Sequence, residues 1–136
     1  KLYSEEMLKA YQTGDKDDPY GDLDSIYKEV YENYKKQENG YTDEFYFAKE
    51  NDEIVGITSG VYDGEIYGIY GLAVKRAFRY KGIGKEIIKQ QLQICKDKKQ
   101  KLAFLQTEEG YYPADTYRKL EFKDVCIEYY YIKREV

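Results

Sequence analysis

The chain of 136 residues contains no histidine. This absence excludes a histidine triad, a histidine general base and a histidine metal ligand. Cysteine is scarce as well: Cys95 and Cys126 are far apart and form no CxxC pair, which argues against a zinc site or a redox motif. We expect no metal. We expect both thiols to be buried and reduced, one in a helix and one in a strand, and this favours a cytoplasmic protein.

Long apolar runs are also missing. None reaches the roughly 18 residues that a membrane-spanning helix needs, and no signal peptide is evident. The net charge of −4, from 22 basic and 26 acidic residues, provides no general basic face for nucleic acid. We therefore expect neither a membrane nor a nucleic acid as partner. Length and composition predict one globular domain over residues 1–136.

Tryptophan is absent, whereas tyrosine occurs 18 times and phenylalanine five times. Tyrosine combines a large apolar ring with a polar tip, so the core and its clefts should be lined with rings that end in hydroxyls. For each single tyrosine except Tyr117, discussed below, packing is the simpler role.

Hydrophobic periodicity and turn residues predict helices and strands in alternation. The expected helices cover Ser4–Tyr11 with Ser4 as N-cap, Asp22–Asn39, Gly82–Lys96 and Pro113–Leu120; the expected strands cover Glu44–Lys49, Glu53–Tyr62, Glu65–Val74, Leu102–Gln106 and Phe122–Lys133. Asn51-Asp52 and Asp63-Gly64 are turn signals, and Gly68 and Gly71 favour a bulge or a close backbone approach. This order predicts a mixed sheet covered by helices, an α/β or α+β fold.

The segment that carries chemistry lies between a strand and a helix. It reads Arg79-Tyr80-Lys81-Gly82-Ile83-Gly84-Lys85 and follows Leu72-Ala73-Val74. A glycine-rich turn before a helix presents free backbone N–H groups together with the positive end of the helix dipole. The lack of Cβ atoms at Gly82 and Gly84 lets a phosphate come close, and the basic side chains add charge. The segment therefore predicts an anion site suited to a pyrophosphate.

Two well-known phosphate motifs fit this segment poorly. A P-loop needs serine or threonine after the lysine, but Glu86 follows Lys85. A dinucleotide-binding fingerprint needs a third glycine where Ile87 stands. A helix that merely starts at a glycine turn remains the alternative.

Two motifs in order give a more specific indication. Arg79-x-x-Gly82-x-Gly84 after Leu72-Ala73-Val74 resembles the acetyl-CoA signature of the GNAT N-acyltransferases. Ala114 to Phe122 resembles their C-terminal motif, A-x-x-x-Y-x-K-x-G-F. The resemblance covers about two thirds of the chain. It implies a mostly antiparallel central sheet flanked by helices and splayed between the strands at about 65–74 and 102–106.

The chain departs from the family pattern at three places. Glu121 stands where the pattern has glycine before Phe122, and Tyr111 stands where many members have asparagine. The family's first strand is not evident before Ser4. Since the sequence begins with Lys1 rather than methionine, we expect that strand upstream of Lys1 or absent.

The resemblance also implies how acetyl-CoA is held. Leu72, Ala73 and Val74 would line the pantetheine arm, with main-chain bonds from Leu72 and Val74 to pantetheine and to the thioester carbonyl. A backbone N–H aimed at that carbonyl stabilises the developing oxyanion, by about 3 kcal/mol. Residues 79–85, namely Arg79, Tyr80, Lys81, Gly82, Ile83, Gly84 and Lys85, would hold the pyrophosphate.

The implied reaction is direct attack of a primary amine on the thioester, without a covalent enzyme intermediate. Tyr117 occupies the family's general-acid position and would protonate the departing thiolate, although core packing is its simpler role. Without histidine, a carboxylate acting directly or through water is the candidate base. Glu65 and Glu108 are the best placed, but a solvated surface role is the more frequent one for such residues.

The acceptor is the least specified partner. The acidic stretch Asp15–Asp24, flanked by tyrosines, predicts a cationic small-molecule or peptide amine, since carboxylates and aromatic faces attract ammonium groups. A solvated acidic loop is the alternative. A homodimer stays open. Two other classes of function also remain: a non-catalytic CoA-binding sensor and a protein-interaction domain of the same fold.

Overall fold

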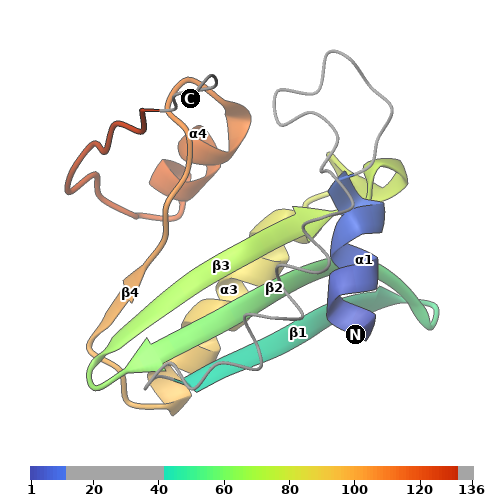
Figure 1. Ribbon diagram of the computed structural model, residues 1–136, viewed down its shortest axis with the longest axis horizontal. Coiled ribbons are helices and arrows are strands. Elements are labelled where there is room, and N and C mark those ends of the chain that lie inside the picture. The colour runs from blue at the N-terminus through green and yellow to red at the C-terminus, as the bar shows by residue number, and fades with distance from the viewer. Residues whose placement is uncertain (12–41, 132–136) are drawn as a thin grey trace, which may run out of the picture. The chain divides into compact units, whose positions relative to one another are not determined.

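The computed structural model describes residues 1–11 and 42–131, and the chain divides into two compact units, Lys1–Gln106 and Thr107–Val136. The larger unit contains a sheet and its helices, and the smaller one contains a single described helix (Figure 1). The elements of the larger unit are α1 (Leu2–Tyr11), β1 (Thr42–Glu50), β2 (Glu53–Asp63), β3 (Ile66–Val74), the 3-10 helix η1 (Arg76–Phe78), α3 (Ile83–Asp97) and β4 (Leu102–Phe104). The smaller unit has α4 (Tyr112–Lys119).

The four described strands form one mixed sheet in the order β1-β2-β3-β4. The first three strands make an antiparallel meander, and β4 joins β3 in parallel. The turn between β1 and β2 has Asn51 and Asp52 at φ 47° and 65°, values typical of the two central residues of a type I′ turn. This arrangement confirms the predicted mixed, mostly antiparallel sheet flanked by helices.

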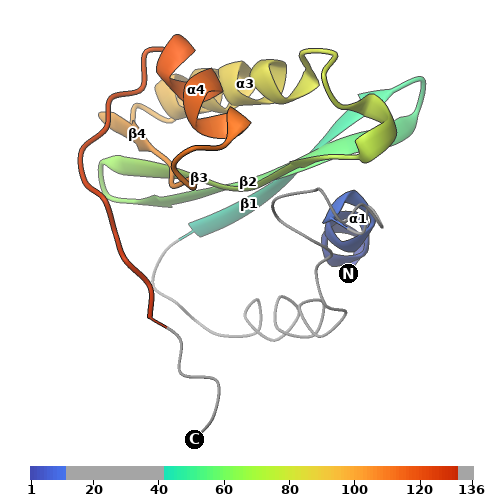
Figure 2. The same ribbon diagram turned by 90° about the horizontal axis from the view of Figure 1, so that it is seen from above.

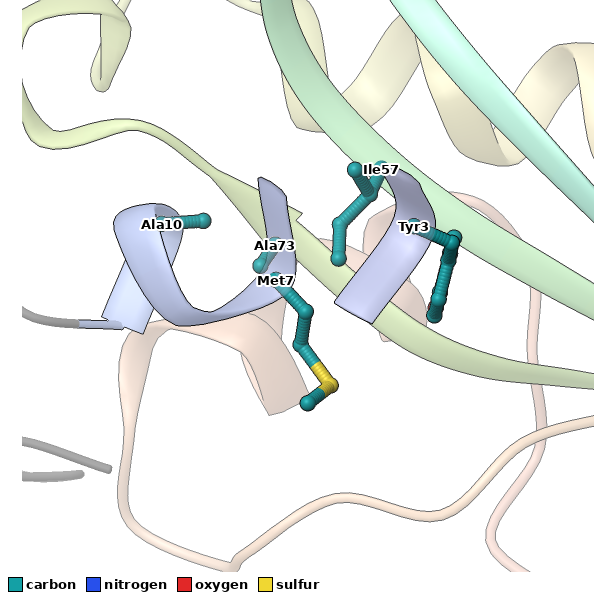
Figure 3. Close-up of a cluster of buried hydrophobic side chains, with 5 residues drawn as sticks. All are labelled: Tyr3, Met7, Ala10, Ile57 and Ala73. Atoms are coloured by element: carbon teal, nitrogen blue, oxygen red, sulfur yellow. The ribbon is translucent and has the colours of Figure 1, made fainter. Parts of the chain in front are cut away.

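Helices cover both faces of the sheet. Figure 2 shows α1 on one face and α3 on the other. On the α1 side, Tyr3, Met7 and Ala10 follow one another at helical spacing and form a buried cluster with Ile57 and Ala73 of the sheet (Figure 3). This cluster fixes α1 over the middle of β2 and the end of β3.

On the opposite face, α3 buries Ile87, Ile88, Gln91 and Cys95. Tyr67 of β3 is fully buried there, and its hydroxyl donates to Gln91 Oε1 at 2.7 Å. A buried hydroxyl needs such a partner, so this bond offsets the desolvation of both polar groups. The buried face of α3 thus combines two isoleucines and Cys95 with the polar Gln91.

Several sequence-based expectations were wrong. The predicted final strand, Phe122–Lys133, is not formed over its described part, because residues 122–131 have no ladder partner there and β propensity alone does not make a strand. Cys126 lies in that segment and is exposed, whereas Cys95 is buried as expected. The first helix starts at Leu2, so Ser4 is not its N-cap; Ser4 Oγ instead donates to Lys1 O at 2.7 Å.

Other boundaries differ by a few residues. The strand at 102 ends at Phe104 rather than Gln106, and α4 begins one residue before Pro113. The predicted helix Asp22–Asn39 lies outside the described residues. Within residues 1–11 and 42–131, no helix is long and apolar enough to cross a membrane.

The C-terminal end of α3 carries strain that glycine would relieve. Lys99 has φ 57°, its N–H bonds to Lys96 O, and the N–H of Gln100 bonds to Cys95 O, which together make a Schellman motif. A left-handed conformation costs a non-glycine residue about 1 kcal/mol. We expect Lys99→Gly to raise the free energy of unfolding by up to about 1 kcal/mol in urea denaturation. The same change at Lys89, in the middle of α3, should lower it by about 1 kcal/mol, and equal effects at both positions would contradict this explanation.

Candidate functional site

A bulge interrupts β3 where the predicted site begins. Ser59 pairs with Tyr70 and Ile57 pairs with Ala73, so the single residue between them on β2 faces both Gly71 and Leu72. Gly71 has φ 57°, a conformation that glycine adopts without steric cost. The expected bulge is therefore confirmed at Gly71.

Gly68 also has a close neighbour, but this is a side chain and not the backbone that the other part of the expectation named. A Cβ at Gly68 would lie 2.5 Å from Cε2 of the Tyr70 ring. Such a distance is far below van der Waals contact, so the Tyr70 ring lies where any other residue's side chain would start. The two glycines thus shape the part of β3 that leads to the site.

Side-chain hydroxyls bind the backbone carbonyls at and around the bulge. The bonds run from Thr58 Oγ1 and Ser59 Oγ to Tyr70 O at 3.2 Å each, from Tyr3 Oη to Gly71 O at 3.3 Å, and from Tyr11 Oη to Leu72 O at 3.4 Å. The two tyrosines come from α1. An unbonded carbonyl in this partly buried place would be costly, so these hydroxyls stabilise the bulged backbone.

Beyond the bulge, β3 has an open edge. β4 pairs with β3 only from Ile66 to Gly68, and no described strand continues along the rest of that edge. Lys75 N–H donates to Val55 O at 2.9 Å, so alternation along the antiparallel ladder turns the N–H and C=O of Val74 away from β2. Val74 therefore directs its main-chain groups to the open edge, as the predicted splay requires. Ala73, next to it, is buried and directs its groups to β2.

The loop after β3 leads into α3, whose N-terminus has no side-chain cap. Gly82 is the N-cap of α3 with φ 84° and gives no side-chain bond to the helix. The first helical bond is Glu86 N–H to Gly82 O, so the N–H groups of Ile83, Gly84 and Lys85 have no acceptor within the helix. Together with the positive end of the helix dipole, they can bind an anion.

The side chains around this helix end suit an anion as well. Lys85 is exposed, and Lys81 Nζ lies 5.3 Å from the centroid of the Phe78 ring, close enough to bind it as a cation. Glu86 is the one acidic residue in the first turn, and its carboxylate accepts from Gln90 Nε2 at 3.1 Å, one turn further along. Tyr80 is 88% exposed with φ 61°. The residues present therefore fit a pyrophosphate.

The strand end and the helix end are neighbours. A Cβ built on Gly84 would lie 3.8 Å from Val74 Cγ2, whereas one built on Gly82 would meet nothing within 4 Å. Donors for an extended amide-containing chain and donors for a diphosphate thus occur side by side within one unit. This brings together the predicted residues 72–74 and 82–85.

Arg79 was expected to help hold the pyrophosphate, but its side chain binds two backbone carbonyls. Its Nε donates to Val74 O at 2.9 Å, and its Nη2 donates to Ala10 O at 3.1 Å. The guanidinium thus joins the end of β3 to the end of α1. Nothing in the sequence motif indicated this role, because Ala10 is 69 residues away along the chain.

Tyr117 lies in the smaller unit, near the end of α4. This helix ends in a second Schellman motif: Glu121 has φ 68°, and the N–H groups of Glu121 and Phe122 bond to Arg118 O at 3.0 Å and Tyr117 O at 3.1 Å. The rings of Tyr117 and Phe122 meet edge to face with centroids 6.2 Å apart. Glu121 thus adopts the conformation for which glycine is best suited.

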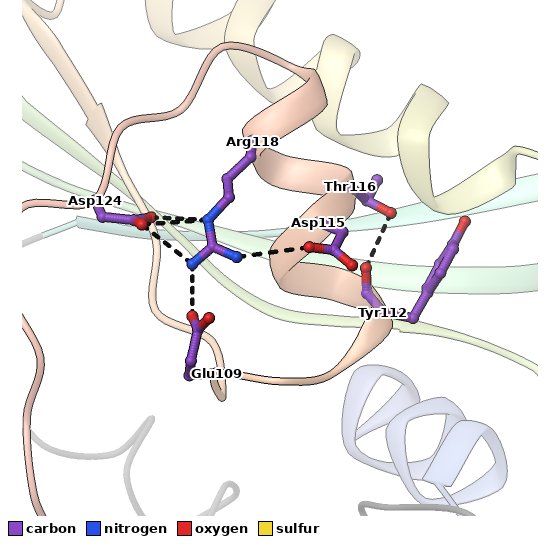
Figure 4. A network of polar contacts seen from close by, with 6 residues as sticks. All are labelled: Glu109, Tyr112, Asp115, Thr116, Arg118 and Asp124. Carbon is purple, nitrogen blue, oxygen red and sulfur yellow. Dashed lines mark hydrogen bonds and ion pairs between the residues drawn. The ribbon is translucent and has the colours of Figure 1, made fainter.

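Sequence reasoning missed Arg118, which holds three acidic residues around α4 (Figure 4). Its ion pairs reach Glu109 at 2.5 Å, Asp124 at 3.1 Å and Asp115 at 3.6 Å. Hydrogen bonds from the guanidinium to Glu109 and Asp124 hold the pKa of Arg118 above its usual range. The group is partly exposed, so each pair contributes little, but together they tie the segments before and after α4 to it. An arginine in a helix's last turn with acids nearby was the available signal.

The candidate bases differ in their surroundings. Glu65 forms an ion pair with Lys101, and its side chain is 64% exposed. Glu108 is exposed and belongs to the smaller unit. In the described part of the chain, no group of three or more acidic or cysteine side chains is arranged to hold a metal.

The sequence profile described as Acetyltransferase (GNAT) family matches residues 4–122. No curated protein sequence matches significantly.

Several solved structures share the fold. A putative acetyltransferase from Pyrococcus furiosus has a TM-score of 0.73 at 17% identity, over 98% of this chain and 95% of that one. An aminoglycoside acetyltransferase from an uncultured soil metagenomic sample, in complex with sisomicin, has a TM-score of 0.66 at 22% identity, over 98% and 90%. Glucosamine-6-phosphate N-acetyltransferase from Arabidopsis thaliana has a TM-score of 0.60 at 16% identity, over 82% and 80%.

Proposed function

Because the chain belongs to the GNAT family of acetyltransferases, we propose that it transfers an acetyl group from acetyl-CoA to a primary amine. The observation that carries this proposal is the proximity of the open edge at Val74 to the uncapped start of α3 at Gly84. An extended pantetheine arm needs main-chain partners, and a pyrophosphate needs clustered N–H donors. Both kinds of donor are present in one short segment of this chain.

Each part of the site would have a separate task. The main chain of Leu72 and Val74 would bind the pantetheine arm, and a Val74 N–H near the thioester carbonyl would stabilise negative charge that develops on its oxygen. Residues 79–85 would bind the diphosphate. The cosubstrate supplies the acetyl group already activated as a thioester, so the protein's contribution is mainly to bind both reactants in line.

Thermal unfolding with acetyl-CoA, free CoA and ATP tests the proposal. A ligand that binds only the folded protein adds about 2.7 kcal/mol of stability at 100 times its Kd, which raises Tm by several degrees. Shifts with both CoA species and little with ATP are expected. No shift with any of them would overturn the proposal. A shift without CoA release from acetyl-CoA across a panel of amines would instead indicate a non-catalytic CoA-binding domain.

Tyr117 would protonate the departing CoA thiolate. This role rests on the match of Tyr117 to the family motif, and the fixed end of α4 supports it by holding the ring against Phe122. We expect Tyr117→Phe to lower kcat by about 100-fold and to leave the KM for acetyl-CoA nearly unchanged, since the ring is kept and only the proton donor is lost. Steady-state kinetics measures both. The matched control is Tyr62→Phe, and equal kcat losses in both variants would refute the assignment.

The acceptor would be a cationic amine. Two of the structural relatives carry names of enzymes that act on amino sugars or aminoglycosides, which supports an amine acceptor. The acidic stretch that motivates the positive charge, Asp15–Asp24, lies outside the described residues. Changing Asp17, Asp18 and Asp22 to asparagine should raise the acceptor KM several-fold and leave the KM for acetyl-CoA unchanged. An unchanged acceptor KM would remove the argument for a cation.

A further inference from the structure

The polar contacts of α1 gather on the end of β3 and on the loop that follows it. They run from Tyr3 Oη to Gly71 O, from Tyr11 Oη to Leu72 O, from Lys75 Nζ to the Glu6 carboxylate at 2.9 Å, and from Arg79 Nη2 to Ala10 O. All four contact points on the sheet side fall between residues 71 and 79. This is the stretch in which β4 no longer supports β3. Side-chain contacts with α1 therefore hold the end of β3 and the loop after it from one face of the sheet.

Arg79 makes one of these contacts and a second bond to β3 itself. Its two bonds of 2.9 and 3.1 Å lie in the normal range for N–H···O and are strengthened by the charge of the donor. Ala10 O is one of the last carbonyls of α1, where the helix dipole is negative and attracts a cation. Val74 O lies on the open edge of β3, where no described strand can bind it. One guanidinium thus binds two carbonyls that accept no hydrogen bond from the regular helix or sheet pattern.

We propose that Arg79 is a positioning residue whose guanidinium braces Val74 against α1, and that neutralising the pyrophosphate is not its main task. The proposal rests on the proposed function, because it concerns how Val74 is held for the pantetheine arm. Fixing the Val74 carbonyl restrains the residue whose N–H is directed to the same open edge. Lysine cannot replace this fork, since a single ammonium lacks two donors fixed in one plane.

Two variants separate bracing from charge. Arg79→Lys keeps the positive charge and loses the fork, whereas Lys85→Ala removes a positive charge at the same helix end and keeps the brace. The two ligands are CoA and pantetheine, and pantetheine lacks the pyrophosphate. Isothermal titration calorimetry measures both affinities, with pantetheine concentrations that extend into the millimolar range. Arg79→Lys should weaken both ligands by about tenfold. Lys85→Ala should weaken CoA alone.

A measurement without ligand keeps the test independent of the proposed function. The brace predicts that Arg79→Lys speeds amide hydrogen exchange in the last turn of α1 and in residues 70–75, while Lys85→Ala leaves both segments unchanged. Unchanged exchange in Arg79→Lys would overturn the inference, and so would a loss of CoA affinity with pantetheine affinity intact. If the unaltered protein binds neither ligand, the proposed function fails, and the exchange result alone then decides whether the brace exists.

Discussion

Replacing Gly60 with alanine is expected to lower the free energy of unfolding by about 3 kcal/mol or more, the range of severe overpacking in a core. The added Cβ would lie 1.9 Å from Tyr67 Oη and 2.5 Å from Tyr67 Cζ. Real Cβ atoms do not approach other heavy atoms so closely, so either the ring or the strand must move. Urea denaturation followed by circular dichroism measures the loss.

Tyr67 has little freedom to yield. Its side chain is 0% exposed, its hydroxyl is bonded to Gln91 in α3, and its ring stacks on Tyr62 with centroids 6.3 Å apart. Burial raises the pKa of Tyr67 to about 12, so the hydroxyl stays a donor even well above neutral pH. Moving the ring would break the bond to Gln91 and leave a buried amide without it, which costs a further 1 to 3 kcal/mol, roughly.

Two controls sharpen this prediction. Gly64 lies in a turn with φ 60°, and a Cβ there would meet nothing within 4 Å. For Gly64→Ala we therefore expect the free energy of unfolding to fall only by the conformational cost, about 1 kcal/mol. Adding Tyr67→Phe to Gly60→Ala removes the closest clash but leaves Cζ at 2.5 Å, so the double variant should recover part of the loss. A loss at Gly60 no larger than that at Gly64 would contradict the packing argument.

The contact also concerns the site, because Tyr67 and Gln91 fix α3 on the sheet. The start of α3 holds the candidate anion donors, and the end of β3 holds Val74. Their separation therefore depends on how β3 and α3 pack along their shared length. A variant that shifts Tyr67 should weaken CoA binding as well as stability.

The sequence was sufficient for the features that depend on short stretches of chain. Hydrophobic patterns and turn signals predicted β1 to β3 and α3, and a bulge expected near Gly68 or Gly71 formed at Gly71. The glycine turn at residues 82–84 predicted the uncapped helix start. In each case the deciding residues lie within a few positions of one another.

Features that depend on contacts between distant parts of the chain could not be predicted from the sequence. The partner of Arg79 is a carbonyl in α1, and backbone carbonyls leave no mark in a sequence. The clash that makes Gly60 necessary depends on which way the Tyr67 ring turns across the hairpin. The expected strand after Phe122 failed for the same reason, because an alternating apolar pattern cannot show whether a partner strand is available.

Gly84→Ala should make the protein more stable and at the same time a weaker binder of CoA. Gly84 is the second residue of α3, and its new Cβ would lie 3.8 Å from Val74 Cγ2, an ordinary contact. Alanine favours a helix over glycine by about 0.5 to 1 kcal/mol, so Tm should rise by roughly 2 to 4 °C. The Cα–Cβ bond in a helix tilts toward the N-terminus, so the methyl group would extend to where a phosphate must approach the N–H donors. We expect CoA affinity to fall by about tenfold or more, the loss of a charge-assisted bond.

The opposite signs separate the two interpretations of the glycine turn. If residues 82–85 only start a helix, Gly84→Ala raises Tm and leaves CoA affinity as it was. If they hold the pyrophosphate, stability rises while affinity falls, because the space that the methyl group fills belongs to the ligand. Lys96→Ala is the matched control, an exposed position of the same helix far along the chain from its start, where alanine should leave the CoA Kd unchanged. Titration calorimetry with CoA and thermal denaturation without it provide the two readouts on the same samples.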